Sequence, residues 1–258
     1  MQNLTATLVQ CELAWESPAQ NRERLESLIA RESGNTDIVV LPEMFTTGFS
    51  MNAEANAEPP GGETEQWLRR MAIELDCAVT GSIATRDGGR VYNRMLFATS
   101  DTVTYYDKRH LFRMAGEEQH YAPGHNRICV TWRGWRILLQ VCYDLRFPVF
   151  SRNRGDYDLA LYVANWPVAR REHWRCLLQA RAIENLACVV GVNRVGEDGN
   201  GLHYAGDSLA LDAHGNHLAE LKEGAETRRV TFDAEALTAH RAHFPFHLDA
   251  DDFSLSVS

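Results

Sequence analysis

Three residues that could serve as a base, a cation and a nucleophile each follow a short strand-like run of residues. They are Glu43 after Val39–Leu41 and Pro42, Lys108 after Thr102–Tyr106, and Cys142 after Ile137–Val141. Catalytic groups gather at strand ends in α/β folds, so these side chains are expected to meet. A buried carboxylate needs a partner, which a lysine provides. A cysteine beside both could lose its proton to the carboxylate and become a nucleophile.

Periodicity alone favours a plainer interpretation, in which Glu43 and Lys108 form a salt bridge at a strand end and Cys142 fills the core. A cysteine–histidine pair made of Cys142 and His110 is a third possibility. It gives Glu43 and Lys108 no role, so it ranks low.

The elements that must position these residues first alternate between strands and helices, and later include paired strands. Ser17 is expected to cap the first helix, with Pro18 at its first position and Gly34 ending it. The hydrophobic periodicity predicts further helices at 64–75, 171–187 and 234–242, and strands at 5–10, 37–41, 79–83, 91–99, 102–106, 128–132, 136–141, 159–164, 189–192, 208–211, 217–221 and 229–232.

Helices covering a mixed sheet, with no linker or repeat, predict one α/β domain over residues 1–233. A second sheet is expected to pack against the first. Residues 234–258 form a tail that we expect to dock on the body or on a partner subunit, although the last few residues could be disordered.

Composition excludes several classes of protein. The 258 residues carry 26 Lys and Arg against 35 Asp and Glu, a formal charge of −9 that argues against nucleic acid and polybasic membrane anchoring. No apolar run is long enough to span a bilayer, and the N-terminus does not resemble a signal peptide. The six cysteines form no CxxC pair, which favours reduced thiols in the cytoplasm.

Neither a metal nor an organic cofactor is expected. The ten histidines lack cysteine or carboxylate neighbours at metal-ligand spacing, and no glycine-rich phosphate loop occurs.

Ordered segments of the chain resemble the signatures of the nitrilase, or carbon–nitrogen hydrolase, superfamily. They are LPEMF at 41–45, YDKRHLF at 106–112, CYDLRFP at 142–148, RAIEN at 181–185 and GDS at 206–208. The resemblance covers residues 1 to about 233. It implies a four-layer α-β-β-α sandwich, assembly into homodimers or larger homo-oligomers, and catalysis by Glu43, Lys108 and Cys142. It also implies a second glutamate at Glu117, with Glu118 as the adjacent alternative.

The resemblance further implies a mechanism. Glu43 would take the Cys142 proton, the thiolate would attack an amide or nitrile carbon, and Lys108 with the Tyr143 backbone N–H would stabilise the oxyanion. Segments such as ANWP at 164–167 and GVNRVG at 191–196 are most similar to the ω-amidase branch, which hydrolyses the terminal amide of 2-oxo acids such as 2-oxoglutaramate and 2-oxosuccinamate.

An anionic oxo acid needs a local cation in a chain of this charge. The candidates are Arg146, Arg170, Arg171 and Arg194, although Arg146 and Arg194 could instead pair with Asp144 or other acids. Arg170 and Arg171 begin a helix, where a cation calls for an acidic partner or substrate. Trp166 could line the pocket or the core, and Tyr143 is a further candidate for substrate binding. Tyr143 and Asp144 are expected to orient the turn that carries the nucleophile.

Other functions stay open at this point. A nitrilase or another small aliphatic amidase would use the same residues. Acyl transfer to another amine and a role as the amidase module of a synthetase are disfavoured because no second domain is predicted. A catalytically silent interaction protein is the non-enzyme alternative, and the three candidate residues argue against it.

Overall fold

A computed structural model describes residues 1–30 and 34–255 of the chain. Its described part contains two six-stranded sheets and a separate two-stranded hairpin. The first sheet has the order β14-β1-β2-β3-β4-β5. Its strands are β1 (Leu4–Gln10), β2 (Ile38–Val40), β3 (Ala78–Asp87), β4 (Arg90–Ala98), β5 (Val103–Asp107) and β14 (Glu226–Phe232). β1, β2 and β3 run parallel, and the other pairings are antiparallel.

The second sheet has the order β13-β12-β9-β8-β7-β6. Its strands are β6 (Cys129–Trp132), β7 (Trp135–Val141), β8 (Leu159–Ala164), β9 (Cys188–Asn193), β12 (Leu209–Leu211) and β13 (His217–Glu220). Here β7, β8 and β9 are parallel and lie at the centre. Each sheet therefore has a parallel centre, whose strand ends can collect functional side chains at one edge.

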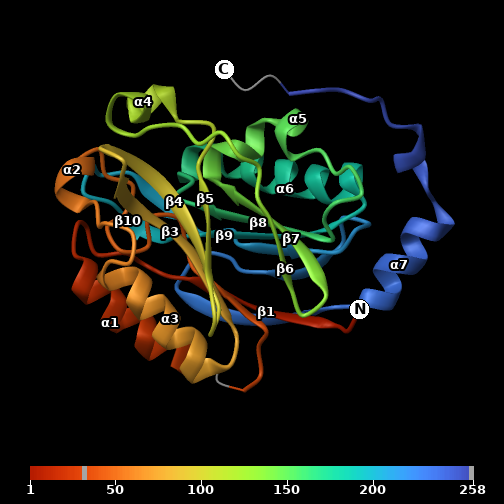
Figure 1. The fold of residues 1–258 in the computed structure, drawn as a ribbon, viewed down its shortest axis with the longest axis horizontal. Coiled ribbons are helices and arrows are strands. Elements are labelled where there is room, and N and C mark those ends of the chain that lie inside the picture. Colours follow the sequence, from red (N-terminus) through yellow and green to blue (C-terminus); the bar gives the residue numbers. More distant parts are fainter. Residues whose placement is uncertain (31–33, 256–258) are drawn as a thin grey trace.

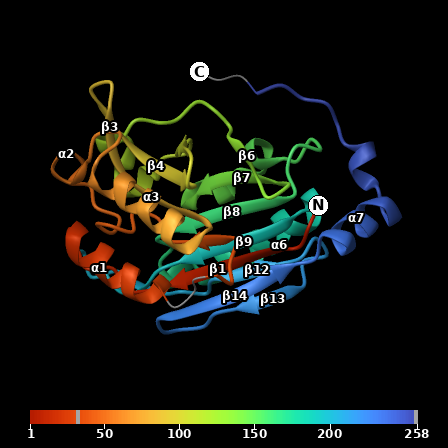
Figure 2. The same ribbon diagram turned by 60° about the horizontal axis from the view of Figure 1, so that its bottom comes forward.

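The two sheets face each other and carry helices on their outer faces (Figures 1 and 2). In β2 the alternation of side chains explains this, because Ile38 and Val40 join the core between the sheets while Val39 joins the core beneath the helices. Helices α1 (Pro18–Ile29) and α3 (Glu63–Leu75) cover the first sheet, and α6 (Arg171–Asn185) covers the second. The expected four-layer α-β-β-α sandwich is confirmed.

Helix α6 approaches its sheet closely at Gly191 on β9. A Cβ atom there would lie 2.4 Å from Leu178 and 2.8 Å from Trp174, so only glycine lets the two layers meet at this distance. The remaining short helices are α2 (Ala53–Asn56), α4 (Glu117–His120) and α5 (Pro148–Ser151). Two short 3₁₀ helices, Cys142–Arg146 and Val168–Arg170, follow β7 and β8.

The sequence located the longer elements well, but it missed the short helices α2, α4 and α5 and two further local features. Ser17 precedes α1 as expected, but its side chain makes no capping hydrogen bond; its carbonyl accepts from Asn21 N instead. The α1 helix ends at Ile29, and part of the stretch before Gly34 lies outside the described residues. The hairpin of β10 (Val195–Glu197) and β11 (His203–Ala205) was not predicted.

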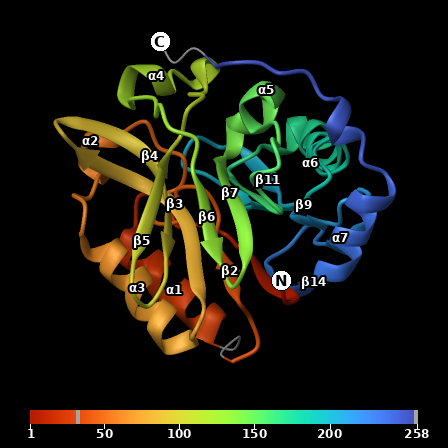
Figure 3. The same cartoon turned by 45° about the vertical axis from the view of Figure 1, so that its right-hand side comes forward.

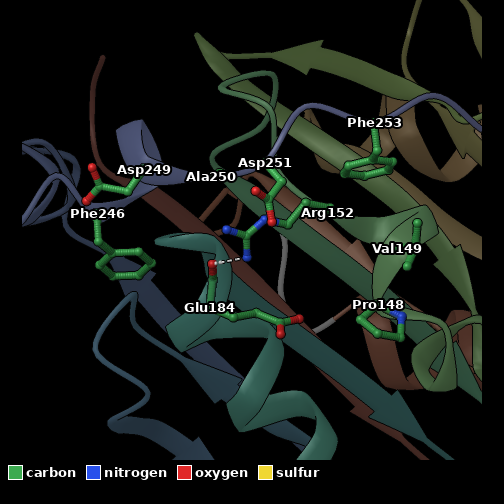
Figure 4. A pocket seen from close by; sticks show the side chains of 9 residues that line it. All are labelled: Pro148, Val149, Arg152, Glu184, Phe246, Asp249, Ala250, Asp251 and Phe253. Carbon is green, nitrogen blue, oxygen red and sulfur yellow. Dashed lines mark hydrogen bonds between the residues drawn. The ribbon is translucent and has the colours of Figure 1, made fainter.

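The chain ends in α7 (Ala234–His243) and an extended segment. Ala234 and Leu237 of α7 are buried, and Arg241 reaches Asp158 and two backbone carbonyls of the body. The following residues pass beside α5 and α6 (Figure 3). A cleft of about 420 Å³ lies between this tail segment and the two helices (Figure 4). Within it, Arg152 donates to the Glu184 carbonyl at 2.7 Å. Among the described residues, no helix is long and apolar enough to cross a membrane.

Candidate active site

Four buried side chains from four separate segments meet between the two sheets. Lys108 Nζ donates to Glu43 Oε1 at 2.9 Å, and to both oxygens of Glu117 at 2.9 and 3.0 Å. The side chains of all three are fully buried. Cys142, which is 9% exposed, is close enough for Lys108 and Glu43 to affect its pKa. The structure thus brings together Glu43, Lys108, Cys142 and Glu117.

Glu43 is directed inward by the turn that ends β2. Leu41 still donates to the Thr80 carbonyl of β3, but Pro42 has no N–H and ends the pairing. Met44 then adopts a left-handed backbone conformation with φ of +46° and donates to the Ser82 hydroxyl. This sharp turn points the Glu43 carboxylate at the space between the sheets.

Lys108 follows β5 and remains tied to the sheet, because its backbone N–H donates to the Asn93 carbonyl of β4 at 2.9 Å. Its own carbonyl accepts from Gly124 N. A Cβ atom at Gly124 would lie 2.0 Å from the Asp107 carbonyl oxygen, so the returning chain can pass this closely only at a glycine. Both contacts fix the backbone from which the ammonium reaches the glutamates.

Cys142 lies in a strained turn between β7 and the 3₁₀ segment, with φ of +44°. Asp144 holds this turn. Its carboxylate accepts from Val141 N at 3.0 Å and Tyr106 Oη at 2.8 Å, and from His110 N at 3.0 Å. Tyr106 and His110 flank Lys108 in the sequence, so one buried carboxylate sets the position of the lysine segment relative to the nucleophile.

Burial and mutual charge decide the protonation of the cluster. Burial raises the pKa of Cys142 well above its usual range, and the Glu43 carboxylate raises it further, against the effect of Lys108. The resting group is therefore a thiol. Burial alone would lower the pKa of Lys108, but Glu117 and Glu43 outweigh it and raise that pKa, so Lys108 is an ammonium. Burial and the Glu43 charge raise the pKa of Glu117, which Lys108 opposes.

The structure distinguishes between the two adjacent glutamates. Glu117 contacts Lys108 and accepts from Phe112 N, whereas Glu118 is 27% exposed and lies 3.9 Å from Arg113. Glu117 belongs to the cluster and Glu118 does not.

The candidate substrate-binding residues Tyr143, Arg146, Trp166 and Arg170 lie near Cys142 and make aromatic and cation–π contacts. The Sγ of Cys142 lies 3.9 Å from the Asn165 carbonyl oxygen, and Trp166 is the next residue. The Arg146 guanidinium lies 4.7 Å from the Trp166 ring centroid. On the other side, the Tyr143 ring packs edge-on against Phe112, and the Arg170 guanidinium lies 5.2 Å from the Phe112 centroid.

Arg146 and Arg170 have no carboxylate partner among the described residues. Arg146 Nη2 contacts His173 Nδ1 at 3.1 Å and does not pair with Asp144, which corrects one alternative drawn from the sequence. Arginines over aromatic faces without an acid are suited to an anionic ligand.

The other two arginines are occupied structurally. Arg171 pairs with Asp207 at 2.8 Å and Glu223 at 2.9 Å, so the acidic partner expected at the helix start is present. Arg194 is buried and donates to backbone carbonyls, those of Leu13, Val195 and Glu197, rather than to the acids proposed for it.

His110 does not face the nucleophile. Its ring contacts Asp144 at 2.7 Å through Nδ1 and stacks on Phe147 with centroids 3.8 Å apart. This arrangement gives no support to a Cys142–His110 pair. Within residues 1–30 and 34–255, no group of three or more His, Cys, Asp or Glu is arranged to hold a metal.

Two asparagines that the sequence did not identify as site residues contact Glu43. The Asn165 backbone N–H donates to Glu43 Oε2 at 2.7 Å and its side chain to the Glu43 carbonyl at 2.6 Å. Asn93 on β4 donates from Nδ2 to Glu43 Oε1 at 2.8 Å and to Glu117 Oε1 at 3.3 Å. A polar Asn93 among the buried residues of β4, between Val91 and Met95, was the available signal.

A buried carboxylate, ammonium and thiol gather at the ends of β2, β5 and β7, between the two sheets of an α-β-β-α sandwich, an arrangement suited to a cysteine-dependent hydrolase. The family model for carbon–nitrogen hydrolases matches residues 5–242, and this chain belongs to that family. The resemblance recognised in the sequence is confirmed.

The chain is also similar in sequence and in structure to individual members of this family. The chain is 51% identical to the omega-amidase YafV of Yersinia enterocolitica over 99% of this chain and all of that one. It is 33% identical to the 2-oxoglutaramate amidase of Bacillus subtilis over 84% of this chain and 85% of that one. The crystal structure of XC1258 from Xanthomonas campestris, a CN-hydrolase superfamily protein with an arsenic adduct in its active site, is 50% identical, with a TM-score of 0.98 over 99% of this chain and all of that one.

Proposed function

We propose that this protein is an ω-amidase, which hydrolyses the terminal amide of small 2-oxo dicarboxylic acid monoamides such as 2-oxoglutaramate and 2-oxosuccinamate to the acid and ammonia. The observation that carries the proposal is the buried Glu43–Lys108–Cys142 cluster beside two arginines without carboxylate partners. The similarity to the Yersinia omega-amidase over the whole chain supports the same substrate class.

The first half of the reaction forms a thioester. Glu43 takes the Cys142 proton as the sulfur attacks the amide carbon, because the raised pKa of the thiol makes prior ionisation unfavourable. The negative charge that develops on the amide oxygen is stabilised by the Lys108 ammonium and the Tyr143 N–H. When the C–N bond breaks, the proton on Glu43 passes to the nitrogen and ammonia leaves.

The second half regenerates the enzyme. Glu43 removes a proton from a water molecule, and the resulting oxygen nucleophile attacks the thioester carbon. The C–S bond then breaks, the product leaves as the acid, and the proton held by Glu43 returns to the sulfur of Cys142. The reaction balances as amide plus water giving acid plus ammonia, and it draws on neither a metal nor an organic cofactor.

Ammonia release from 2-oxoglutaramate, 2-oxosuccinamate, glutamine and a simple nitrile tests the proposal. We expect release from the two oxo amides, and a loss of at least about 10³-fold in Cys142→Ala because the covalent route disappears. Circular dichroism should show that the variant is folded. Release from the nitrile or from glutamine in preference to the oxo amides would contradict the proposed substrate class.

Three further proposals concern the protein outside its active site. Residues 1–233 are the hydrolase domain and 234–258 a tail that packs on it, which the buried Leu237 supports. We place the enzyme in the cytoplasm, since all six cysteines are free. A homodimer or larger homo-oligomer is supported by exposed apolar side chains on α5, α6 and the tail, namely Val149, Ile183 and Leu248. Light scattering should give a mass at least twice 29.1 kDa.

A further inference from the structure

The hydrogen bonds around the two glutamates leave little room for a proton. A carboxylate offers about four lone-pair sites, two on each oxygen. On Glu117, Oε1 accepts from Lys108 Nζ and Asn93 Nδ2, and Oε2 accepts from Lys108 Nζ and Phe112 N. Every site on Glu117 is therefore occupied by a donor.

Glu43 differs from Glu117 in one position. Its Oε1 accepts from Lys108 Nζ at 2.9 Å and Asn93 Nδ2 at 2.8 Å, while its Oε2 accepts from Asn165 N at 2.7 Å. Among the hydrogen bonds of residues 1–30 and 34–255, no second donor reaches Oε2 apart from the Cys142 thiol that interacts with this carboxylate. Of the two glutamates, Glu43 is therefore the one with a lone-pair position left for a proton, and it is also the one that interacts with the sulfur of Cys142.

Asn93 is the group that both glutamates share with Lys108. Its Nδ2 and the ammonium nitrogen each contact Glu43 Oε1 and Glu117 Oε1, so two donors and two acceptors alternate around a closed ring. The amide nitrogen must face this ring, because an amide oxygen there would repel both carboxylates. Without Asn93, one site on each Oε1 would be free to take a proton.

Folding alone does not explain an asparagine at this position. Its Oδ1 is buried with no hydrogen-bond partner in the described part of the chain, which costs stability. The neighbouring inward positions on β4 carry apolar side chains, Val91 and Met95. The benefit that offsets this cost is on the nitrogen side, toward the glutamates.

We propose that Asn93 is a positioning residue that directs the thiol proton to Glu43 Oε2, by occupying the competing proton sites on Glu43 Oε1 and Glu117 Oε1. It touches neither substrate nor sulfur and acts through the two carboxylates. This inference rests on the proposed function for the catalytic role of Glu43, but its main test does not require the natural substrate.

The test measures how the reactivity of Cys142 depends on pH in Asn93→Leu, which keeps the approximate shape and removes the donor. Asn93→Ala is a second variant in case leucine does not fit. Alkylation by iodoacetamide is followed by mass spectrometry of the Cys142 peptide, because Cys129 and Cys176 are exposed. We expect the acid limb of the rate to move up by about one to two pH units, since both variants remove the hydrogen bond that Glu43 Oε1 accepts from Asn93.

In parallel, kcat for 2-oxoglutaramate should fall about 10- to 100-fold at neutral pH with KM nearly unchanged, and the melting temperature should fall little. The matched control is Thr80→Val on the adjacent strand β3, which removes a buried hydroxyl that, within the described part of the chain, bonds only to the Leu96 carbonyl. It should keep the wild-type acid limb.

An unchanged acid limb in both folded Asn93 variants, or an equal shift in Thr80→Val, overturns the inference. These outcomes are separable from a failure of the proposed function. If the wild type released no ammonia from any oxo amide but the alkylation limb still moved in the Asn93 variants alone, the substrate would be wrong and the role of Asn93 would stand.

Discussion

At the scale of single residues, the proposed mechanism requires Lys108 to stabilise an oxyanion, although all three hydrogens of its ammonium are already donated to glutamates. Two of them go to the two oxygens of Glu117 and one to Glu43. Giving up one of the two bonds to Glu117 would free a hydrogen for the substrate while the ion pair survives through the other. In the proposed mechanism, Glu117 would therefore position Lys108 and could release one of its two hydrogen bonds without leaving the ammonium unpaired.

Arg146 and Arg170, which lie over aromatic rings, lead to a prediction about substrate specificity. In Arg146→Gln and Arg170→Gln, we expect kcat/KM for 2-oxoglutaramate to fall about 10- to 100-fold, mainly through KM. Each variant lacks a guanidinium, so the substrate carboxylate would lose one charge-assisted hydrogen bond. The methyl ester of the same substrate should be turned over equally by the wild type and both variants. Steady-state ammonia release on both compounds measures this difference.

The control for that prediction is Arg113→Gln. The Arg113 side chain is 84% exposed and lies 3.9 Å from Glu118, so its loss should leave both substrates unaffected. If kcat/KM fell equally for the acid and for the neutral ester in Arg146→Gln and Arg170→Gln, these arginines would have a structural role and would not bind the substrate carboxylate.

At the scale of elements, strand ends account for what the sequence could predict. Apolar runs located β2, β5 and β7 closely enough to place Glu43, Lys108 and Cys142 at their ends. Asn93 could not be found in this way, because it lies inside β4, and its meeting with Glu43 depends on which face of β4 points inward. That choice follows from the register with β3, where Asn93 pairs with Ala84, and register is a tertiary property.

The other features that the sequence did not predict are short elements and a helix cap. The helix that carries Glu117 has four residues, too few to show a periodic pattern, so its position rested on the family resemblance. The β10–β11 hairpin has three-residue strands around a loop with two glycines, Gly199 and Gly201. Ser17 had the residue type of a cap, but with φ of −127° and ψ of 71° its hydroxyl bonds none of the first helical N–H groups.

At the scale of the whole molecule, the C-terminal helix ties the tail to the second sheet through one charged side chain. Arg241 on α7 donates to Asp158 Oδ1 at 2.6 Å, to the Leu186 carbonyl at 2.8 Å and to the Tyr157 carbonyl at 2.9 Å. Asp158 precedes β8 and also accepts from Arg136 at 2.7 Å. A single contact point therefore joins α7, the start of β8 and the residue that follows α6.

Arg241→Gln should lower the free energy of unfolding by about 1–3 kcal/mol at pH 7, because hydrogen bonds to a mostly buried carboxylate are lost. Burial would raise the pKa of Asp158, but its bonds with Arg136 and Arg241 outweigh burial and lower that pKa. The stabilisation is thus complete above the pKa of an unfolded aspartate, about 3.9, and is lost only as the pH falls through the lower pKa of the folded state. Urea unfolding should give the same difference in unfolding free energy between variant and wild type at pH 7 and pH 5, and a smaller difference below about pH 4.

Arg228→Gln, which removes an exposed partner of Glu226, is the control and should change stability by less than about 0.5 kcal/mol. A difference for Arg241→Gln that shrank between pH 7 and pH 5 would mean that a group other than Asp158, such as a histidine of α7, carries the contact.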